Sequence, residues 1–409
     1  MNTGRFRVTV NGFRVNAQTW DDALNWDGWG DEVFFKSSAR VVNADKSEGD
    51  QYDRTTAVMG DTSAYAPKVW AGTGKPTGGL ITGDTFPGSE PWKKSRSANL
   101  DQEYPPFRLW EGKLTQKQDT VFIALALYEW DPGENFLQGL IEWLGKSITK
   151  LKQADLFGPT AKKVFEGFEL GLDVMGSFPL GDSGTKPIGI RKAGKSGYGE
   201  FTPKVIVLNY DNAIQLINNR PSGRDFGVIE INYYDDVYYA GNYSIFVQIE
   251  YLVDEDAVIK SDLSQKVYTV VGGGKLWIDS PSQLDERYGG ATRLEVIPQG
   301  VLEVMPDYPM DGTLIQEWEK PEVYVMYAGA KIWIPSFDEL KWYGAVERIR
   351  KIPVNAASRL PHVPRPGTVF VERGTRKRVL FSQNGVQIPW FEVLGMSAYT
   401  VPDGTLDRI

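Results

Sequence analysis

Residues Gly189 to Ser196 (GIRKAGKS) match the G-x-x-x-x-G-K-S spacing of the loop that binds phosphate in nucleotide triphosphatases. In such a loop, backbone N–H groups and the start of the following helix converge on the anion, and the lysine adds charge. Here Gly197, Gly199 and Pro203 follow within a few residues and prevent a helix from starting. We therefore interpret the segment as a basic connection between strands and not as a nucleotide site.

The composition excludes several kinds of catalytic chemistry. The 409-residue chain has no cysteine, so disulfides, zinc–thiolate sites and thiol nucleophiles are excluded. It has one histidine, His362, which lies in a proline-flanked segment and makes a Ser-His-Asp triad a poor hypothesis. The formal net charge of -8 argues against nucleic-acid binding, and the basic cluster Arg373–Arg378 is too short to reverse it. We therefore predict a protein that is not an enzyme.

One acidic segment offers oxygen ligands on a sharply turning loop, as a hard cation such as Ca²⁺ requires. The candidate metal ligands are Asp27, Asp31, Glu32 and Asp131. The EF-hand pattern is not met, so calcium is one hypothesis, and turn or helix-cap roles for these side chains are the other.

The C-terminal third contains an internal repeat. Lys266 to Ser280 reads KVYTVVGGGKLWIDS, Glu322 to Ser336 reads EVYVMYAGAKIWIPS, and a diverged third copy, Arg376 to Trp390, reads RKRVLFSQNGVQIPW. Each copy predicts a hairpin, and the first two continue into a helical turn that begins at a serine. A strand that ends at Ile-Pro and a fourth strand after Gly-Thr complete the expected unit.

Four strands repeated three times favour a closed barrel, and we predict a β-trefoil-like domain, with three stacked or laterally arranged sheet units as the alternative. A tryptophan in the hairpin resembles the Trp-bearing strand of many β-trefoils, but the Gln-x-Trp triplet of the sugar-binding ones is absent. The resemblance therefore concerns architecture alone. The candidate ligand-binding residues come from the hairpins and are Trp277, Trp333, Lys275, Lys331 and Trp390. Core packing is the other interpretation of the two hairpin tryptophans.

The first two-thirds of the chain predict an antiparallel β-sandwich, because short alternating segments are separated by glycine-rich turns. Phe6–Val15 alternates around Asn11-Gly12, which is a strong hairpin signal. Asn135–Gln153 and Thr160–Met175 have the apolar spacing of amphipathic helices and predict an inserted helical hairpin.

These patterns predict a mainly β chain with two domains. The first is a sandwich-like domain over residues 1–258 with a helical insert at about 134–178. The second is a three-repeat domain over 262–409, with units near 266–320, 321–375 and 376–409. No stretch is apolar enough for a transmembrane segment and no Sec signal peptide is evident, so we expect a soluble protein of unknown compartment.

The function we expect is recognition of a glycan or cell-surface ligand by the repeat domain. One alternative is a structural subunit that binds other protein subunits in a tail, filament or injection apparatus. A second alternative is a pore-forming toxin that uses the helical hairpin.

Overall fold

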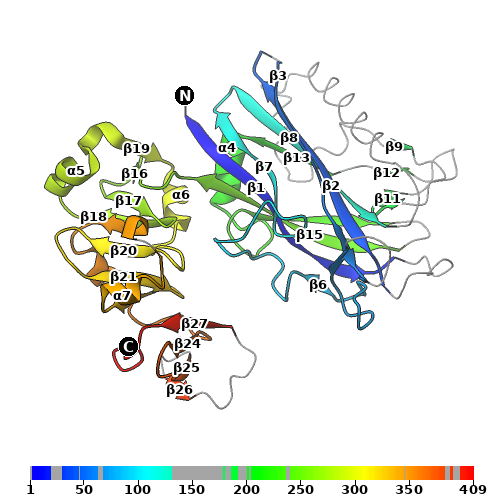
Figure 1. The fold of residues 1–409 in the computed structure, drawn as a ribbon. Coiled ribbons are helices and arrows are strands. Elements are labelled where there is room, and N and C mark those ends of the chain that lie inside the picture. Colours follow the sequence, from blue (N-terminus) through cyan, green and yellow to red (C-terminus); the bar gives the residue numbers. More distant parts are fainter. Residues whose placement is uncertain are drawn as a thin grey trace. The chain divides into compact units, whose positions relative to one another are not determined.

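The computed structural model describes residues 2–19, 30–45, 47–62, 68–130, 178–179, 186–191, 200–201, 204–235, 240–344, 346–382, 387–389 and 397–409. Within these residues the chain is mainly β, as predicted. It divides into two compact units, Met1–Leu252 and Val253–Ile409, which are described separately below (Figure 1). No helix in the described part is long and apolar enough to cross a membrane.

Strand β1 (Thr3–Ala17) is the centre of a five-stranded sheet in the first unit. On one side it pairs with β15 along most of its length, and on the other side it pairs first with β7 and then with β6. The partner strands are β14 (Val228–Tyr234), β15 (Asn242–Leu252), β7 (Phe107–Thr115) and β6 (Thr85–Phe86).

The hairpin predicted at Asn11-Gly12 is wrong, because β1 continues through these residues as one strand. The pairing with β15 only shifts its register between Val10 and Gly12, as at a β-bulge. A side chain at Gly12 would come within 2.3 Å of the main-chain oxygen of Phe86. The glycine therefore allows a close approach of two backbones, and not a reversal of the chain.

A second, seven-stranded sheet is built around the antiparallel pair β2 (Val33–Asn43) and β8 (Asp119–Glu129). Its other strands are β3 (Glu48–Thr55), β4 (Val58–Gly60), β5 (Lys68–Trp70), β10 (Lys186–Pro187) and β13 (Lys204–Asn209). A small third sheet consists of β9 (Phe178–Pro179), β11 (Ile190–Arg191) and β12 (Glu200–Phe201).

Aromatic side chains join the two large sheets. Phe35 on β2 lies 5.8 Å from Phe13 on β1 and 5.5 Å from Phe107 on β7, measured between ring centroids, and all three are fully buried. Helix α4 (Tyr210–Ile217) begins at a capping box and adds Tyr210 to the same core. This core of large rings agrees with the high aromatic content of the sequence.

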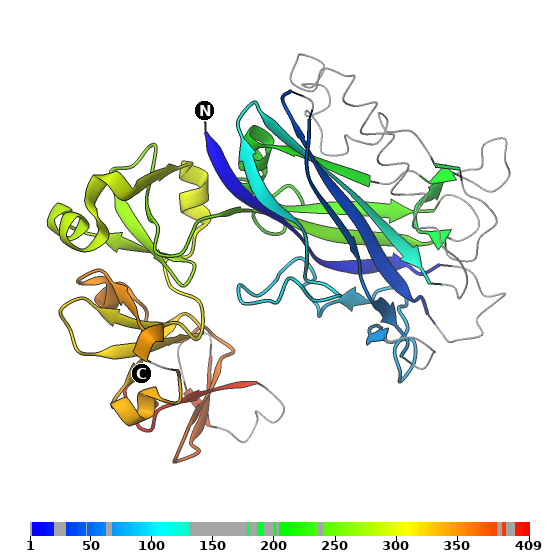
Figure 2. The ribbon, with the colours of Figure 1, turned by 45° about the horizontal axis from the view of Figure 1, so that its top comes forward.

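The described residues of the second unit form three four-stranded sheets, one for each repeat (Figure 2). The first consists of β16 (Val258–Ser261), β17 (Val267–Val271), β18 (Gly274–Ile278) and β19 (Leu294–Ile297). The second consists of β20 (Leu314–Glu317), β21 (Val323–Tyr327), β22 (Ala330–Ile334) and β23 (Arg350–Ile352). The third consists of β24 (Val369–Glu372), β25 (Arg378–Phe381), β26 (Gln387–Pro389) and β27 (Ala398–Val401).

The described residues do not close the barrel that we expected for a β-trefoil. The last strand of each repeat runs parallel to the first strand of the same repeat, so every repeat completes its own open sheet. The alternative of three stacked or laterally arranged sheet units agrees with this arrangement. The strand after Gly312-Thr313 also belongs to the sheet of the following hairpin, which shifts the frame of each repeat by one strand relative to the sequence pattern.

Local signals in the repeats were predicted well. Ser280 and Ser336 each accept a hydrogen bond from a backbone N–H of the following turn and begin α5 (Pro281–Tyr288) and α7 (Phe337–Leu340), which confirms the predicted serine caps. Two further short helices, α6 (Gln299–Val304) and α8 (Ala356–Arg359), follow the Ile-Pro dipeptides.

Buried clusters cross from one repeat to the next. Val271 and Leu276 of the first repeat pack with Ile315 and Met326 of the second. A similar cluster joins the second repeat to Phe370 and other residues of the third. Each sheet thus buries one face against a neighbour, as in stacked repeat proteins.

Candidate functional site

The two hairpin tryptophans predicted as ligand-binding residues are on the surface of the second unit. Trp277 on β18 and Trp333 on β22 are 37% and 38% exposed, although the residues beside them in each strand are buried or nearly so. Each lies directly opposite a tyrosine, Tyr268 or Tyr324, on the neighbouring strand. Each of the first two repeats therefore carries a Tyr–Trp pair on one face of its hairpin.

An arginine from the following repeat stacks on each tryptophan. The guanidinium of Arg359 lies 4.5 Å from the ring of Trp277, and that of Arg408 lies 4.7 Å from the ring of Trp333. Sequence reasoning missed both arginines. A signal existed, because each lies seven residues after the first residue of an Ile-Pro or Val-Pro dipeptide, Ile352 or Val401.

Each of the two predicted lysines bonds to a main-chain oxygen of its own repeat; Lys275 is buried, whereas Lys331 is partly exposed. Lys275 donates to the main-chain oxygen of Met305 and forms an ion pair with Asp307 at 2.8 Å. Lys331, at the equivalent place in the second repeat, donates to the main-chain oxygen of Ala357. Both lysines hold the segment that follows the last strand of their own repeat.

A pocket of about 320 Å³ opens beside Lys331 in the second repeat. It is lined by Glu317, Lys320, Glu322, Tyr324, Lys331, Ala357 and Ser358. Burial lowers the pKa of Lys331, and the nearby Glu317 carboxylate opposes this effect. Because Tyr324 is the cross-strand partner of Trp333, the pocket adjoins the exposed Tyr–Trp pair.

The pocket coincides with a small residue at a position that is otherwise large. Ala357 stands five residues after Ile352, and the corresponding residues of the other repeats are Leu302 and Leu406. All three are buried. Alanine lacks most of the leucine side chain, so the second repeat has more space at this point.

The predicted metal ligands that the structure describes, Asp31 and Glu32, are buried and bonded within the protein. Asp31 accepts hydrogen bonds from the backbone and hydroxyl of Thr19 at 2.9 Å and from the hydroxyl of Tyr243. Glu32 accepts from the backbone N–H of Asp61 at 3.3 Å. The part of the chain that the structure describes contains no group of three or more ligand side chains suited to a metal ion.

Four further predictions lie wholly or partly outside the described residues. They concern Asp27, Asp131, Trp390 and the helical hairpin between 135 and 175. Most of the loop with the nucleotide-binding pattern lies there too. Its first residue, Gly189, is described and donates its N–H to Asp235 at 2.7 Å, and the next two residues form β11.

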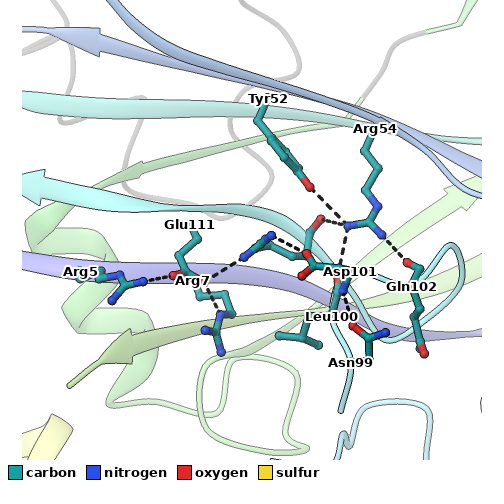
Figure 3. Close-up of polar contacts among 10 residues, drawn as sticks. Arg5, Arg7, Tyr52, Arg54, Asn99, Leu100, Asp101, Gln102 and Glu111 are labelled. Atoms are coloured by element: carbon teal, nitrogen blue, oxygen red, sulfur yellow. Dashed lines mark hydrogen bonds and ion pairs between the residues drawn. The ribbon is translucent and has the colours of Figure 1, made fainter. Parts of the chain in front are cut away.

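The first unit contains an arginine cluster around one carboxylate (Figure 3). Glu111 on β7 accepts from Arg5 and from Arg7, the latter at 2.8 Å, and lies 3.5 Å from Arg108. Burial acts to raise the pKa of Glu111, but the hydrogen bonds and charges of Arg7 and Arg5 outweigh it, so the pKa lies below its usual value. These contacts tie β1 to β7.

Arg54, also drawn in Figure 3, anchors a loop beside this cluster. It donates to the main-chain oxygens of Leu100 at 3.1 Å, of Arg108 at 3.3 Å and of Gln102. The acceptors are supplied by the protein itself, so we assign the cluster to the scaffold of the first unit and not to ligand binding.

Comparison of the chain with models of protein families, with curated proteins and with solved structures found no match. Function is therefore inferred from the geometry of the first two repeats and their hairpin tryptophans.

Proposed function

We propose that this protein is a non-enzymatic binding protein whose repeat domain recognises a glycan or another cell-surface ligand. In this proposal the first unit, whose two large sheets touch through Phe13 and Phe35, is a sandwich-like scaffold. The observation that carries the proposal is the repeated exposure of a tryptophan, Trp277 and Trp333, in otherwise buried strands. Flat aromatic rings of this kind give rigid contact area to sugars and peptides.

The stacked arginines support a binding role. Arg359 covers part of Trp277 and Arg408 covers part of Trp333, yet more than a third of each residue stays exposed. A ring held by a guanidinium loses less conformational freedom when a ligand arrives, so less of the binding free energy is spent on ordering it. The polar pocket beside Tyr324 adds hydrogen-bonding groups next to the ring surface.

The experiment compares binding of the purified protein to a glycan array and to insoluble polysaccharides with that of the Trp277→Ala and Trp333→Ala variants. We expect at least one variant to lose binding by about 10-fold or more, because a stacked aromatic anchor contributes about 1–3 kcal/mol. The matched control is Trp70→Ala, which removes a tryptophan that is 58% exposed and lies in the first unit. Far-UV circular dichroism checks that each variant is folded. Wild-type binding in both hairpin variants, or no binding to any polysaccharide or cell surface, would contradict the proposal.

A second candidate is a structural subunit of a larger assembly. It is supported by exposed apolar side chains on the repeat unit, among them Leu263 at 79%, Phe337 at 63% and Val296 at 58%. Size-exclusion chromatography with light scattering tests it. A strict monomer at high concentration would count against assembly from copies of this chain.

A further inference from the structure

The pocket of the second repeat has one carboxylate that the fold already satisfies and one cation that it does not neutralise directly. Glu317 accepts backbone N–H groups from Asn355 at 2.6 Å and from Ala357 at 3.2 Å, and Lys320 forms an ion pair with it at 2.8 Å. The ammonium of Lys331, by contrast, donates to the neutral main-chain oxygen of Ala357. A half-buried ammonium with such a partner favours the arrival of an anionic group.

Two polar groups at the edge of the pocket remain available to a ligand. Glu322 is exposed, and no residue that the structure describes donates a hydrogen bond to its carboxylate. The hydroxyl of Tyr324 likewise has no hydrogen bond to the described residues. Together they provide an acceptor and a donor at a short distance from the cation.

We infer that this pocket binds a small hydroxylated anion of the acidic-monosaccharide class. The ligand carboxylate pairs with Lys331, and its hydroxyl groups bond to Glu322 and Tyr324. A volume of about 320 Å³ lies at the low end of the range for small-molecule sites, roughly 300–1,000 Å³, and suits one sugar ring. The inference deepens the proposed function, on which it rests only for the assumption that the natural ligand is a glycan.

Charge decides between acidic, neutral and basic sugars. A neutral sugar leaves Lys331 with the nearby charge of Glu317, which Lys320 already pairs, and an amino sugar places a third cation near Lys320 and Lys331. An acidic sugar places its carboxylate on the partly buried ammonium and its hydroxyls toward Glu322, whose exposed carboxylate is screened by water and so repels the ligand less than Lys331 attracts it. A bound carboxylate also opposes the effect of burial on the pKa of Lys331.

The neighbouring repeats lack this combination. The first repeat has Lys266 at the position of Glu322 and the larger Leu302 at the position of Ala357. In the third repeat, strand pairing puts Val379 at the position of Tyr324. We therefore assign the site to the second repeat alone.

The test titrates the full-length protein with D-galacturonate and with D-galactose in a calorimeter, since the two probes differ in the carboxylate. We expect galacturonate to bind on the order of 10-fold tighter than galactose, or more, because hydrogen bonds to charged groups contribute this much. Lys331→Met should abolish the difference. Lys275→Met, the matched control at the equivalent place in the first repeat, should preserve it.

Tyr324→Phe removes one hydroxyl and keeps the ring, and it should weaken galacturonate binding several-fold. It tests the pocket independently in case Lys331→Met does not fold. Equal binding of the two sugars, or no binding of galacturonate, glucuronate or N-acetylneuraminate, would overturn the inference. So would wild-type affinity in both pocket variants. If galacturonate does not bind, but the protein binds a polysaccharide and the tryptophan variants lose that binding, the pocket is rejected and the proposed function is retained. If galacturonate binds and no polysaccharide does, the pocket is retained and the proposed function is rejected.

Discussion

Replacing Arg373 with alanine is expected to loosen the junction between the second and third repeats. Arg373 directly follows β24, and its guanidinium lies 4.6 Å from the ring of Trp342 and 5.3 Å from the ring of Tyr343. Its Nε donates to Glu339 at 3.0 Å. One side chain of the third repeat therefore makes three contacts with the second.

These three contacts set the size of the expected loss in local stability. The side chains of Arg373 and Glu339 are 26% and 19% exposed, so their ion pair contributes about 0.5–1 kcal/mol after solvent screening. Each cation–π contact contributes roughly 0.5–1 kcal/mol at such a site. The Arg373→Ala change should therefore lower local stability by about 1.5–3 kcal/mol, and Arg373→Lys by about half as much, because lysine keeps the charge and loses the planar stack.

Hydrogen exchange measured by mass spectrometry on peptides from β24 and β27 gives this local free energy of opening without assuming that the two units unfold together. A double-mutant cycle with Trp342→Ala should give a coupling energy of about 0.5–1 kcal/mol. Arg348→Ala, at an exposed arginine of the same unit, is the control and should leave the exchange unchanged. A coupling energy of zero, with both single variants destabilised, would refute the stacking argument.

Three further changes test buried polar groups. Glu372→Ala should lower the free energy of unfolding in urea by about 2–4 kcal/mol, because a buried carboxylate that accepts from Thr375 and a backbone N–H is lost; Glu372→Gln should cost less. Burial lowers the pKa of Lys36 from its usual 10.5 to about 8. Between pH 8 and pH 10.5 the unfolded chain therefore binds more protons than the folded chain, and the free energy of unfolding should rise with pH. Lys36→Met should therefore stabilise the protein by about 3 kcal/mol at pH 7 and progressively less in alkaline urea titrations. Tyr243→Phe removes the donor to buried Asp31 and should lower the melting temperature, at a cost of about 1–3 kcal/mol.

Local patterns in the sequence were sufficient for the mainly β class, the hairpins of the repeats and the serine caps. They were not sufficient for the way strands combine. Apolar alternation in β19 or β23 does not say whether the strand joins its own sheet in parallel or closes a shared barrel. At Asn11-Gly12 the local turn preference was overridden, because β15 pairs along one side of the strand, and β7 up to Val10 and β6 from Phe13 pair along the other.

The sequence singled out only those residues of the candidate site that recur between the repeats. Trp277, Trp333 and Lys331 stand out because they recur at a fixed place in the copies. Ala357 does not stand out, because the feature that matters is its difference from the leucines of the other repeats. A repeat pattern directs attention to positions that are shared, whereas a site present in one repeat depends on the positions that differ.

At the junctions between repeats, too, equivalent positions carry different side chains. At the second junction Arg373 supplies the cation, and Trp342 belongs to the preceding repeat. At the first junction the types are exchanged, because Trp318 occupies the place after β20 and Arg287 of the preceding repeat lies 5.2 Å from its ring. If the end of the first repeat met the start of the third, Arg287 would face Arg373 and two like charges would replace a favourable stack. The exchange of side chains between equivalent positions therefore disfavours packing of the first repeat against the third, a mismatch that identical junctions would not create.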